Sequence, residues 1–232
     1  FSRQEETGEA ILRPLIHDYP EDRRFDDTGD AFLVGMDLLH APFITKDAAE
    51  RTVPLPRGSW YALDTGEWLT GGADIVRPRE PDTTPLFLRG GAVVPWSLAP
   101  DGSNEWDGRE VSFLIVPEPA DRRSENGSSR PRLTSAHGTY TWDDGQSFAY
   151  RRGERSTLSL VARFAEDQDG GLAVHAEHLQ DGAGRLLPAV AVLGAWDSVT
   201  LVCDGSEVAC RMERDTIRIA GHDHEVTTVT PT

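Results

Sequence analysis

Closely spaced turn-forming residues are the feature that most constrains the fold. The 232 residues include 22 glycines and 15 prolines, which divide the chain into short apolar runs. From about residue 45 onward these runs recur roughly every ten residues, an interval typical of β-sandwiches. In the run from Leu158 to Phe164 apolar and other residues alternate, so Leu158, Leu160, Ala162 and Phe164 share one face. This pattern predicts a mainly β protein whose sheets have one buried and one solvated face, with few long helices.

The first 44 residues follow a different pattern. Ile11–Ile16 is predicted to be a short buried strand, and Asp37–Ile44 another. Between them a helix is expected over Asp27–Gly35, with Asp27 or Thr28 as its N-cap and Gly35 as its stop. An alternation of helix and strand is typical of an α/β domain, but a single repeat cannot close a core. We therefore expect residues upstream of this sequence to complete that domain, and interpret the chain as a piece of a longer protein.

Turn-forming and polar residues also predict a domain boundary and a loop. The segment Pro100–Gly108 is rich in turn formers and is the predicted domain boundary, after which a second β unit begins at Val111–Val116. Within that unit Glu118–Pro131 has a loop-like composition. The predicted organisation is residues 1–44, then 45–100, then 101–232.

Charge and hydropathy exclude several classes of partner. Lys and Arg total 23 against 39 Asp and Glu, giving a net charge of −16, which disfavours binding to a phosphate backbone or an anionic membrane surface. No apolar run approaches the roughly 18 residues that a membrane-spanning helix needs. Phe1 is not followed by a basic and then apolar leader, and localisation, cytoplasmic or secreted, is left open. Cys203 and Cys210 are interpreted as reduced core thiols, with a hairpin disulfide as the alternative.

Candidate catalytic groups are concentrated in one acidic segment. Because it follows a predicted barrel-type strand, whose carboxyl end would face an active site, His17 and Asp18 are the candidate rim residues. Paired carboxylates could catalyse glycoside hydrolysis, but such clusters are more often solvated charges or helix caps. The six carboxylates of the segment are Asp18, Glu21, Asp22, Asp26, Asp27 and Asp30.

The sequence predicts no metal or cofactor site. His175 and His178 would point to opposite faces of a strand, and His222 and His224 share a face but lack a third ligand nearby. Asp143–Gly145 is interpreted as a hairpin turn, because the ligand spacing of a calcium loop is missing. No glycine-rich phosphate loop or nucleophile elbow occurs.

Aromatic residues leave a second kind of function open. Trp60, Tyr61 and Trp68 flank one predicted turn. Such rings either pack in a core or form flat platforms for sugars. The alternative function is therefore a non-catalytic carbohydrate-binding or structural β-sandwich protein.

Five segments together resemble the C-terminal third of glycoside hydrolase family 31. The resemblance covers residues 8–155, and the order and spacing of the segments agree as well. The segments are Leu12-Arg-Pro-Leu-Ile-His-Asp-Tyr-Pro-Glu-Asp22, Asp30-Ala-Phe-Leu-Val-Gly-Met-Asp-Leu-Leu-His-Ala-Pro42, Leu55-Pro-Arg-Gly-Ser-Trp-Tyr61 with Asp64-Thr-Gly-Glu67, Pro85-Leu-Phe-Leu-Arg-Gly-Gly-Ala-Val-Val-Pro-Trp96, and Tyr140-Thr-Trp-Asp-Asp-Gly-Gln-Ser147.

The resemblance implies an architecture of two β-sandwich domains after the final βα unit of a (β/α)8 barrel. Residues 1–44 would then hold the barrel's last strand and helix, 45–100 a proximal sandwich and 101–232 a distal one. Arg13 would be an ion-pairing partner inside the barrel.

The resemblance also implies a function for the longer protein: a retaining, exo-acting α-glycosidase, most simply an α-glucosidase, that needs no cofactor. Its two catalytic carboxylates would lie upstream, so no residue of this chain is expected to be catalytic. The substrate, an α-linked oligosaccharide or an α-glucoside, would bind to the missing barrel. The oligomeric state is not predicted.

Overall fold

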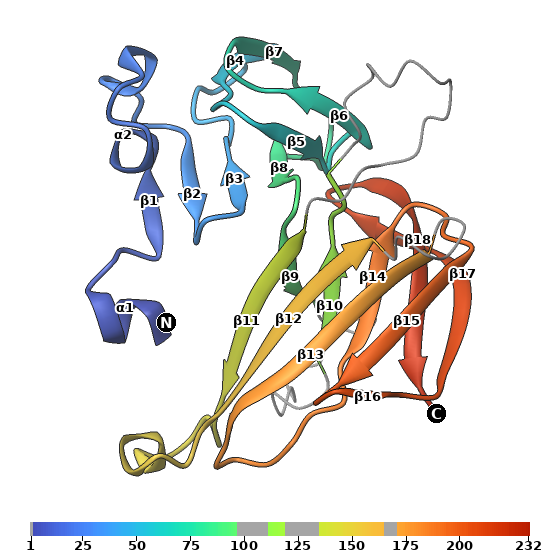
Figure 1. Cartoon of the computed structure of the whole chain (residues 1–232). Coiled ribbons are helices and arrows are strands. Elements are labelled where there is room, and N and C mark those ends of the chain that lie inside the picture. Colours follow the sequence, from blue (N-terminus) through green and yellow to red (C-terminus); the bar gives the residue numbers. More distant parts are fainter. Residues whose placement is uncertain (1, 97–110, 119–134, 165–170) are drawn as a thin grey trace. The chain divides into compact units, whose positions relative to one another are not determined.

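The computed structural model describes residues 2–96, 111–118, 135–164 and 171–232, and it is mainly β (Figure 1). The chain divides into two compact units. Unit 1 comprises Phe1–Gly90 and Ile217–His224, and unit 2 comprises Gly91–Thr216 and Glu225–Thr232. The predicted boundary at Pro100–Gly108 lies outside the described residues, as does nearly all of the loop-like segment that follows Glu118.

Unit 1 is built on an antiparallel sheet. Within the described residues this sheet has six strands in the order β1-β2-β3-β8-β5-β6, and β4 and β7 form a separate antiparallel ribbon. The elements are α1 (Ser2–Thr7), β1 (Leu12–Pro14), α2 (Leu15–Asp18), the 3-10 turn η1 (Arg23–Phe25), β2 (Phe32–Val34), β3 (Leu38–His40), β4 (Glu50–Pro54), β5 (Ser59–Ala62), β6 (Glu67–Thr70), β7 (Asp74–Pro78) and β8 (Leu86–Arg89).

The helix predicted over Asp27–Gly35 is wrong, because this segment ends in strand β2. Leu33 is buried between two half-buried neighbours, a strand alternation, and it pairs with Arg13 on one side and Leu39 on the other. Gly35 adopts a φ of 63° in the tight connection to β3, so it ends a strand rather than a helix. Ladder hydrogen bonds on both edges outweigh the local helix signal.

The predicted final βα unit of a barrel does not form either. The strand predicted over Ile11–Ile16 ends at Pro14 and gives way to the single turn of α2. β1 then pairs antiparallel with β2, whereas the strands of a (β/α)8 barrel pair in parallel. The described chain therefore contains no part of a barrel sheet.

The core of unit 1 combines the six-stranded sheet with the irregular N-terminal segment. Trp60, Phe87 and Leu39 project from the sheet and are fully buried. Leu15 of α2 and Phe25 of η1 belong to the same cluster. Burial of these side chains holds the short α2 turn in place, since a four-residue helix is not stable by itself.

Unit 2 is a β-sandwich. Its described residues form two five-stranded sheets, β17-β18-β14-β10-β9 and β11-β12-β13-β15-β16, each with one parallel pair, β10 with β14 and β13 with β15. The elements are β9 (Val93–Trp96), β10 (Ser112–Ile115), β11 (Ala136–Trp142), the 3-10 turn η2 (Ala149–Arg152), β12 (Ser156–Phe164), β13 (Gly171–Asp181), β14 (Ala189–Leu193), β15 (Ser198–Cys203), β16 (Ser206–Glu207), β17 (Cys210–Ile219) and β18 (His222–Pro231).

One core joins the two sheets of unit 2. Leu158, Leu160 and Ala162 are fully buried on one face of β12, which confirms the predicted alternation. They share a cluster with Phe113 of β10 and Val192 of β14 in the other sheet. The long neighbouring arrows β11, β12 and β13 in Figure 1 form one layer of this sandwich.

The strand β9 pairs across the predicted division of the chain. It lies in the range 45–100 predicted for the first β unit, but it pairs with β10 in unit 2. Local apolar content cannot predict this pairing, because it does not identify the partner strand. The turn η2 ends at Gly153, which has a left-handed φ of 88°.

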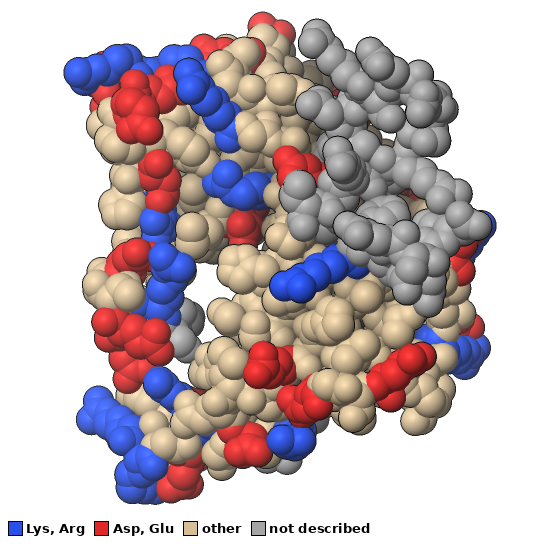
Figure 2. All heavy atoms as spheres, viewed as in Figure 1, with Lys and Arg blue, Asp and Glu red and all other residues tan. Residues whose placement is uncertain are grey.

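The two cysteines are free, with Cys203 buried and Cys210 partly buried. No helix in the described part of the chain is long and apolar enough to cross a membrane. On the face shown in Figure 2, acidic and basic side chains are interspersed over the described surface.

Candidate active-site rim

His17 and Asp18, the candidate rim residues, both lie in α2 of unit 1. The backbone N–H of Tyr19 donates to the carbonyl of Leu15 at 3.0 Å and ends this turn. The two side chains differ in exposure: that of His17 is 49% exposed and that of Asp18 only 18%. The turn thus directs the imidazole outward and the carboxylate toward the sheet.

Asp18 belongs to an ion network centred on a buried arginine. Arg13 donates through Nε to Asp18 Oδ2 at 2.9 Å, and Arg13 Nη2 donates to Asp18 Oδ1. Arg13 Nη1 donates to Glu9 Oε2 at 2.8 Å, and Arg3 Nε donates to that same oxygen at 2.6 Å. His17 Nδ1 lies 3.4 Å from Asp18 Oδ1. We call Arg3, Glu9, Arg13, His17 and Asp18 the Arg13 cluster. Arg13 forms ion pairs as predicted, but it does so within unit 1 and not inside a barrel.

The Arg13 cluster keeps both of its carboxylates ionised. Hydrogen bonds from Arg13 hold the pKa of Asp18 below its usual range, and those from Arg3 and Arg13 lower the pKa of Glu9 to about 2. A general acid near neutral pH needs the opposite, a raised pKa. Both oxygens of Asp18 are also occupied by Arg13. The arrangement therefore suits a structural anchor and not proton transfer.

Three of the remaining acidic residues of this segment, Asp22, Asp26 and Asp30, favour the same interpretation. Asp22 caps η1 by accepting from the backbone N–H of Arg24 at 3.2 Å. Further carboxylates pair with arginines: Asp22 with Arg24 at 2.6 Å, Asp26 with Arg23 at 3.1 Å, and Asp30 with Arg51 at 3.0 Å.

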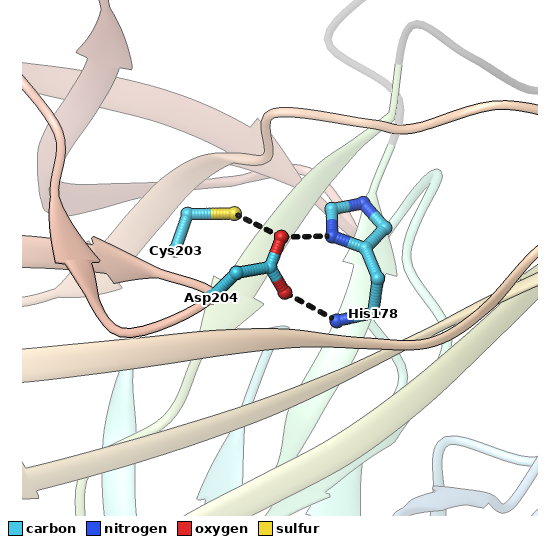
Figure 3. A group of neighbouring side chains, drawn as sticks. All are labelled: His178, Cys203 and Asp204. Carbon is cyan, nitrogen blue, oxygen red and sulfur yellow. Dashed lines mark hydrogen bonds and ion pairs between the residues drawn. The ribbon is translucent and has the colours of Figure 1, made fainter.

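A second polar cluster, in unit 2, was missed by the sequence reasoning. Asp204 accepts from the backbone N–H of His178 at 2.9 Å and from His178 Nδ1 at 3.0 Å, and Cys203 Sγ lies 3.9 Å from the same carboxylate (Figure 3). β13 and β15 run in parallel, which brings the ends of these strands together. Asp204 and Gly205 both have positive φ and turn the chain into β16. The Asp-Gly pair after an apolar strand is the signal that could have located this turn.

His178, Cys203 and Asp204 present three potential metal-ligand atoms within 4.8 Å of one another, but their protonation does not suit a resident metal. His178 Nε2 accepts from the backbone N–H of Leu186 at 3.0 Å, so the network assigns the ring proton to Nδ1. A metal bound at Nδ1 would displace this proton. A metal-bound histidine donates a hydrogen bond from its other ring nitrogen, but here that nitrogen, Nε2, faces the N–H donor of Leu186. Burial also raises the pKa of the Cys203 thiol. We interpret the group as a hydrogen-bonded lock between β13 and β15.

Most of the described tryptophans are not available as sugar platforms. Trp60, Trp142 and Trp196 are buried, and Trp60 Nε1 donates to the carbonyl of Pro56 at 2.8 Å. Trp68 is the most exposed at 36%, and its ring packs edge-on against Tyr61 with centroids 5.2 Å apart. The tryptophans therefore give little support to a carbohydrate-binding module.

Comparison with known proteins identifies the family. Residues 8–94 match the model of the glycosyl hydrolase family 31 C-terminal domain. The chain is 27% identical over 167 residues to "Alpha-glucosidase 2" of Bacillus thermoamyloliquefaciens, which covers 72% of this chain and 19% of that protein. It is 29% identical over 188 residues to a 1,6-alpha-glucosyltransferase of Sporosarcina globispora, covering 80% of this chain and 13% of that protein. Residues 8–94 are thus a family 31 C-terminal domain, and the similarity to these relatives extends over most of the chain.

Solved structures of family 31 share the fold. A Flavobacterium johnsoniae GH31 dextranase complexed with glucose superposes with a TM-score of 0.71 at 18% identity, covering 99% of this chain and 28% of that one. The catalytic subunit of ER glucosidase II, in its heterodimeric complex, gives a TM-score of 0.70 at 17% identity, covering all of this chain and 25% of that one. The chain spans about a fifth or less of the curated relatives above, and its match to a C-terminal domain supports a non-catalytic C-terminal portion of such a protein.

The Asp-Asp-Gly segment forms a self-capped turn after β11. Asp143 Oδ1 accepts from the backbone N–H of Gly145 at 2.8 Å. The Ser147 hydroxyl donates to Asp144 Oδ2 at 2.5 Å, and Asp144 Oδ1 accepts from the backbone N–H groups of Ser147 at 3.0 Å and Gln146 at 3.1 Å; these hydrogen bonds lower the pKa of Asp144. The carboxylates hold the backbone of the turn, in agreement with the hairpin-turn interpretation.

Proposed function

We propose that this chain supports the catalytic domain of a retaining, exo-acting α-glycosidase, most simply an α-glucosidase that cleaves glucose from the non-reducing ends of α-glucosides without a cofactor. The observation that carries the proposal is the family 31 C-terminal match, together with relatives named as α-glucosidases. The reaction needs one carboxylate as nucleophile and one as acid/base. Asp18, the candidate carboxylate, is held ionised by Arg13, so both catalytic groups would lie upstream of this chain.

The two units would be the proximal and distal C-terminal domains. We propose unit 1 as the proximal β-sandwich predicted over 45–100, and unit 2 as the distal one predicted over 101–232. Strands β1 to β3, from the segment 1–44, share their sheet with β8, β5 and β6. That continuity supports including most of this segment in the proximal domain instead of assigning it to the barrel.

The surface around α2 is the proposed contact with the catalytic domain. Leu12 on β1 and Ile16 on α2, next in sequence to Arg13 and His17, are 58% and 40% exposed. A domain that covers them would remove both apolar side chains from water. When the catalytic domain covers this surface, His17 and Asp18 would lie at the rim of its active site. They would hold the chain at that rim in place without contacting the reacting atoms.

The proposal is tested by comparing this chain with a longer polypeptide that also carries the upstream barrel. Both are assayed with an aryl α-glucoside, after intact mass and circular dichroism verify composition and folding. The longer polypeptide is expected to hydrolyse the substrate and to release α-glucose first, as seen by NMR, whereas the 232 residues alone give no turnover. Hydrolysis by the 232 residues alone would overturn the proposal.

The carbohydrate-binding alternative makes a different prediction. Titration calorimetry with maltose would then show binding to the 232 residues, and the longer polypeptide would bind α-glucosides without cleaving them. The supporting role predicts no heat of binding for the 232 residues.

A further inference from the structure

A hydrogen-bonded pair of residues far apart in sequence is buried in unit 1. Tyr61 lies on β5, and His224 lies on β18 in the segment 217–224, which we call the hairpin tip. The Tyr61 hydroxyl is 3.0 Å from His224 Nδ1. Tyr61 is 7% exposed and His224 only 1%. Neither Tyr61 nor His224 belongs to the proposed supporting surface at α2, so that function does not account for the pair.

The hydrogen bonds of His224 assign the tautomer of its neutral ring. Its Nε2 lies 3.4 Å from the carbonyl oxygen of Ile219, an atom that can only accept. In the neutral ring Nε2 therefore carries the proton, and Nδ1 accepts from the Tyr61 hydroxyl. The two ring nitrogens thus connect β5 to the turn of the hairpin tip.

Burial opposes a positive charge on the His224 ring more strongly than its hydrogen bonds to the backbone of Ile219 and Leu63 and the nearby Asp223 favour one, so the pKa of His224 is lowered. On its own strand His222 stacks edge-on at 5.1 Å between ring centroids, and Asp223 is 60% exposed and paired with Arg218 at 2.9 Å. From β5 the titratable group that faces it is Tyr61, and behind Tyr61 lies the uncharged ring of Trp68 on β6. The attraction of Asp223 is therefore weak, while a protonated His222 would repel a second imidazolium.

Close packing makes this docking intolerant of adjustment. A Cβ added to Gly66, in the β5–β6 turn, would lie 2.6 Å from His222 Nε2. A Cβ on Gly221 would lie 2.9 Å from Thr83 Cγ2. These close contacts leave the docked tip little freedom to shift, and the His224 ring is buried, so an added charge on it is relieved by separation of the hairpin tip from the rest of unit 1.

We propose that the Tyr61–His224 pair is an acid-sensitive latch, which holds the hairpin tip on the β5–β6 hairpin while His224 is neutral and releases it when the imidazole is protonated. Burial lowers the pKa of His224 from its ordinary value of 6.5. The released state therefore binds the proton more readily than the docked state. The docking free energy is complete above pH 6.5 and decreases as the pH falls below that value.

Hydrogen exchange of the whole 232-residue chain tests the latch. Exchange of backbone amides in residues 217–224 is measured by mass spectrometry at pH 7.5 and pH 5, after correction for the intrinsic pH dependence of exchange. We expect protection of the tip to fall several-fold on acidification, because protonation of His224 favours the released state. Strands β12 and β13 of the unit 2 core should keep their protection and serve as the internal reference.

Two variants separate the latch from general acid effects. His224→Gln keeps a neutral donor and acceptor at this position, so its tip protection should not change between the two pH values. His175→Gln is the matched control, because His175 lies exposed on β13 and should leave the wild-type response intact. The latch is overturned if acid leaves wild-type tip protection unchanged, or if His224→Gln loses protection as wild type does.

A second measurement covers the case in which His224→Gln does not fold. NMR titration of the His224 ring protons in the wild-type chain should give a pKa below 6.5, and the shift should be accompanied by exchange broadening in the hairpin tip. A pKa at or above 6.5, with His224 titrating in a docked tip, would contradict the latch.

Discussion

The guanidinium of Arg13 donates to both carboxylate oxygens of Asp18, and its remaining terminal nitrogen donates to Glu9. Arg13 lies on β1, and Asp18, five positions later in the chain, ends the single turn of α2. A side-chain bridge thus closes a segment that has little regular backbone hydrogen bonding of its own. The planar guanidinium fork suits this bidentate contact, which lysine could not make.

Removal of the buried cation should destabilise unit 1. Arg13→Met keeps much of the side-chain volume but leaves Asp18, which is only 18% exposed, without its main partner. We expect a loss of about 2–3 kcal/mol in the free energy of unfolding, near the lower end for breaking a buried ion pair. Urea denaturation at pH 7 measures it. Arg3→Met is the control and should cost less than about 1 kcal/mol, because Arg3 is mostly exposed. Equal losses in the two variants would contradict the central role of Arg13.

Acid should remove the contribution of the Arg13 cluster. The pKa of Glu9 is lowered from 4.5 to about 2, and that of Asp18 is lowered from its ordinary 3.8. Carboxylates with a lowered folded-state pKa stabilise the fold fully above the unfolded-state value, and this stabilisation is lost as the pH falls through the folded-state value. The stability difference between wild type and Glu9→Gln/Asp18→Asn should therefore be constant from pH 7 to about 5 and shrink toward pH 2. Urea midpoints across this range test it, and a constant difference down to pH 2 would be inconsistent with the ion pairs.

A methyl group at Gly71 should disrupt the β5–β6 hairpin. Its Cβ would lie 1.8 Å from the carbonyl oxygen of Pro56 and 3.0 Å from the Trp60 ring, and one of these contacts is backbone that cannot rotate away. We expect Gly71→Ala to lower the free energy of unfolding by about 3 kcal/mol, the upper part of the range for overpacking. Gly29→Ala is the matched control, since an added Cβ there meets no atom within 4 Å. Thermal unfolding of both variants decides the question, and similar midpoints would show that Pro56 can move.

Local sequence patterns predict a strand correctly where apolar residues alternate along it. They fail where pairing with a strand remote in sequence determines the secondary structure. Leu158, Leu160 and Ala162 show their shared face directly in the sequence, so β12 could be predicted. The segment that ends in β2 carries helix caps and apolar residues as well, and only its pairing with β1 and β3 makes it a strand. The hairpin tip could not be assigned to unit 1 either, because the Tyr61–His224 contact spans 163 positions.

Partners remote in sequence also decide the candidate sites. His17 and Asp18 are adjacent in the sequence, but the sequence does not show that Arg13 occupies both oxygens of Asp18. The sequence pattern relates His178 only to His175, on the same strand. Its actual partner, Asp204, comes from the turn after a parallel strand, and no local spacing indicates that register.

Asp204→Asn should weaken the lock between β13 and β15. Asp204 accepts from two donors of His178, the backbone N–H and Nδ1–H. An asparagine tolerates the left-handed φ of 48° at this position, but its NH₂ group would face one of these donors. We expect a loss of about 1–3 kcal/mol from the unsatisfied donor, measured by urea denaturation. Glu207→Gln, an exposed carboxylate on the adjoining β16, should be nearly neutral, and an equally large effect there would indicate a general charge effect.

Zinc should not stabilise unit 2, although His178, Cys203 and Asp204 lie close enough to share an ion. A ligand that binds the folded state raises the unfolding midpoint in proportion to the logarithm of its concentration over Kd. Coordination at His178 Nδ1 would require removal of the proton that Asp204 accepts, while Nε2 still faces the N–H of Leu186. The thermal midpoint should therefore be the same with and without excess Zn²⁺, in wild type as in Cys203→Ser. A zinc-dependent rise in wild type that Cys203→Ser abolishes would show that the histidine can change tautomer and that the lock is a metal site.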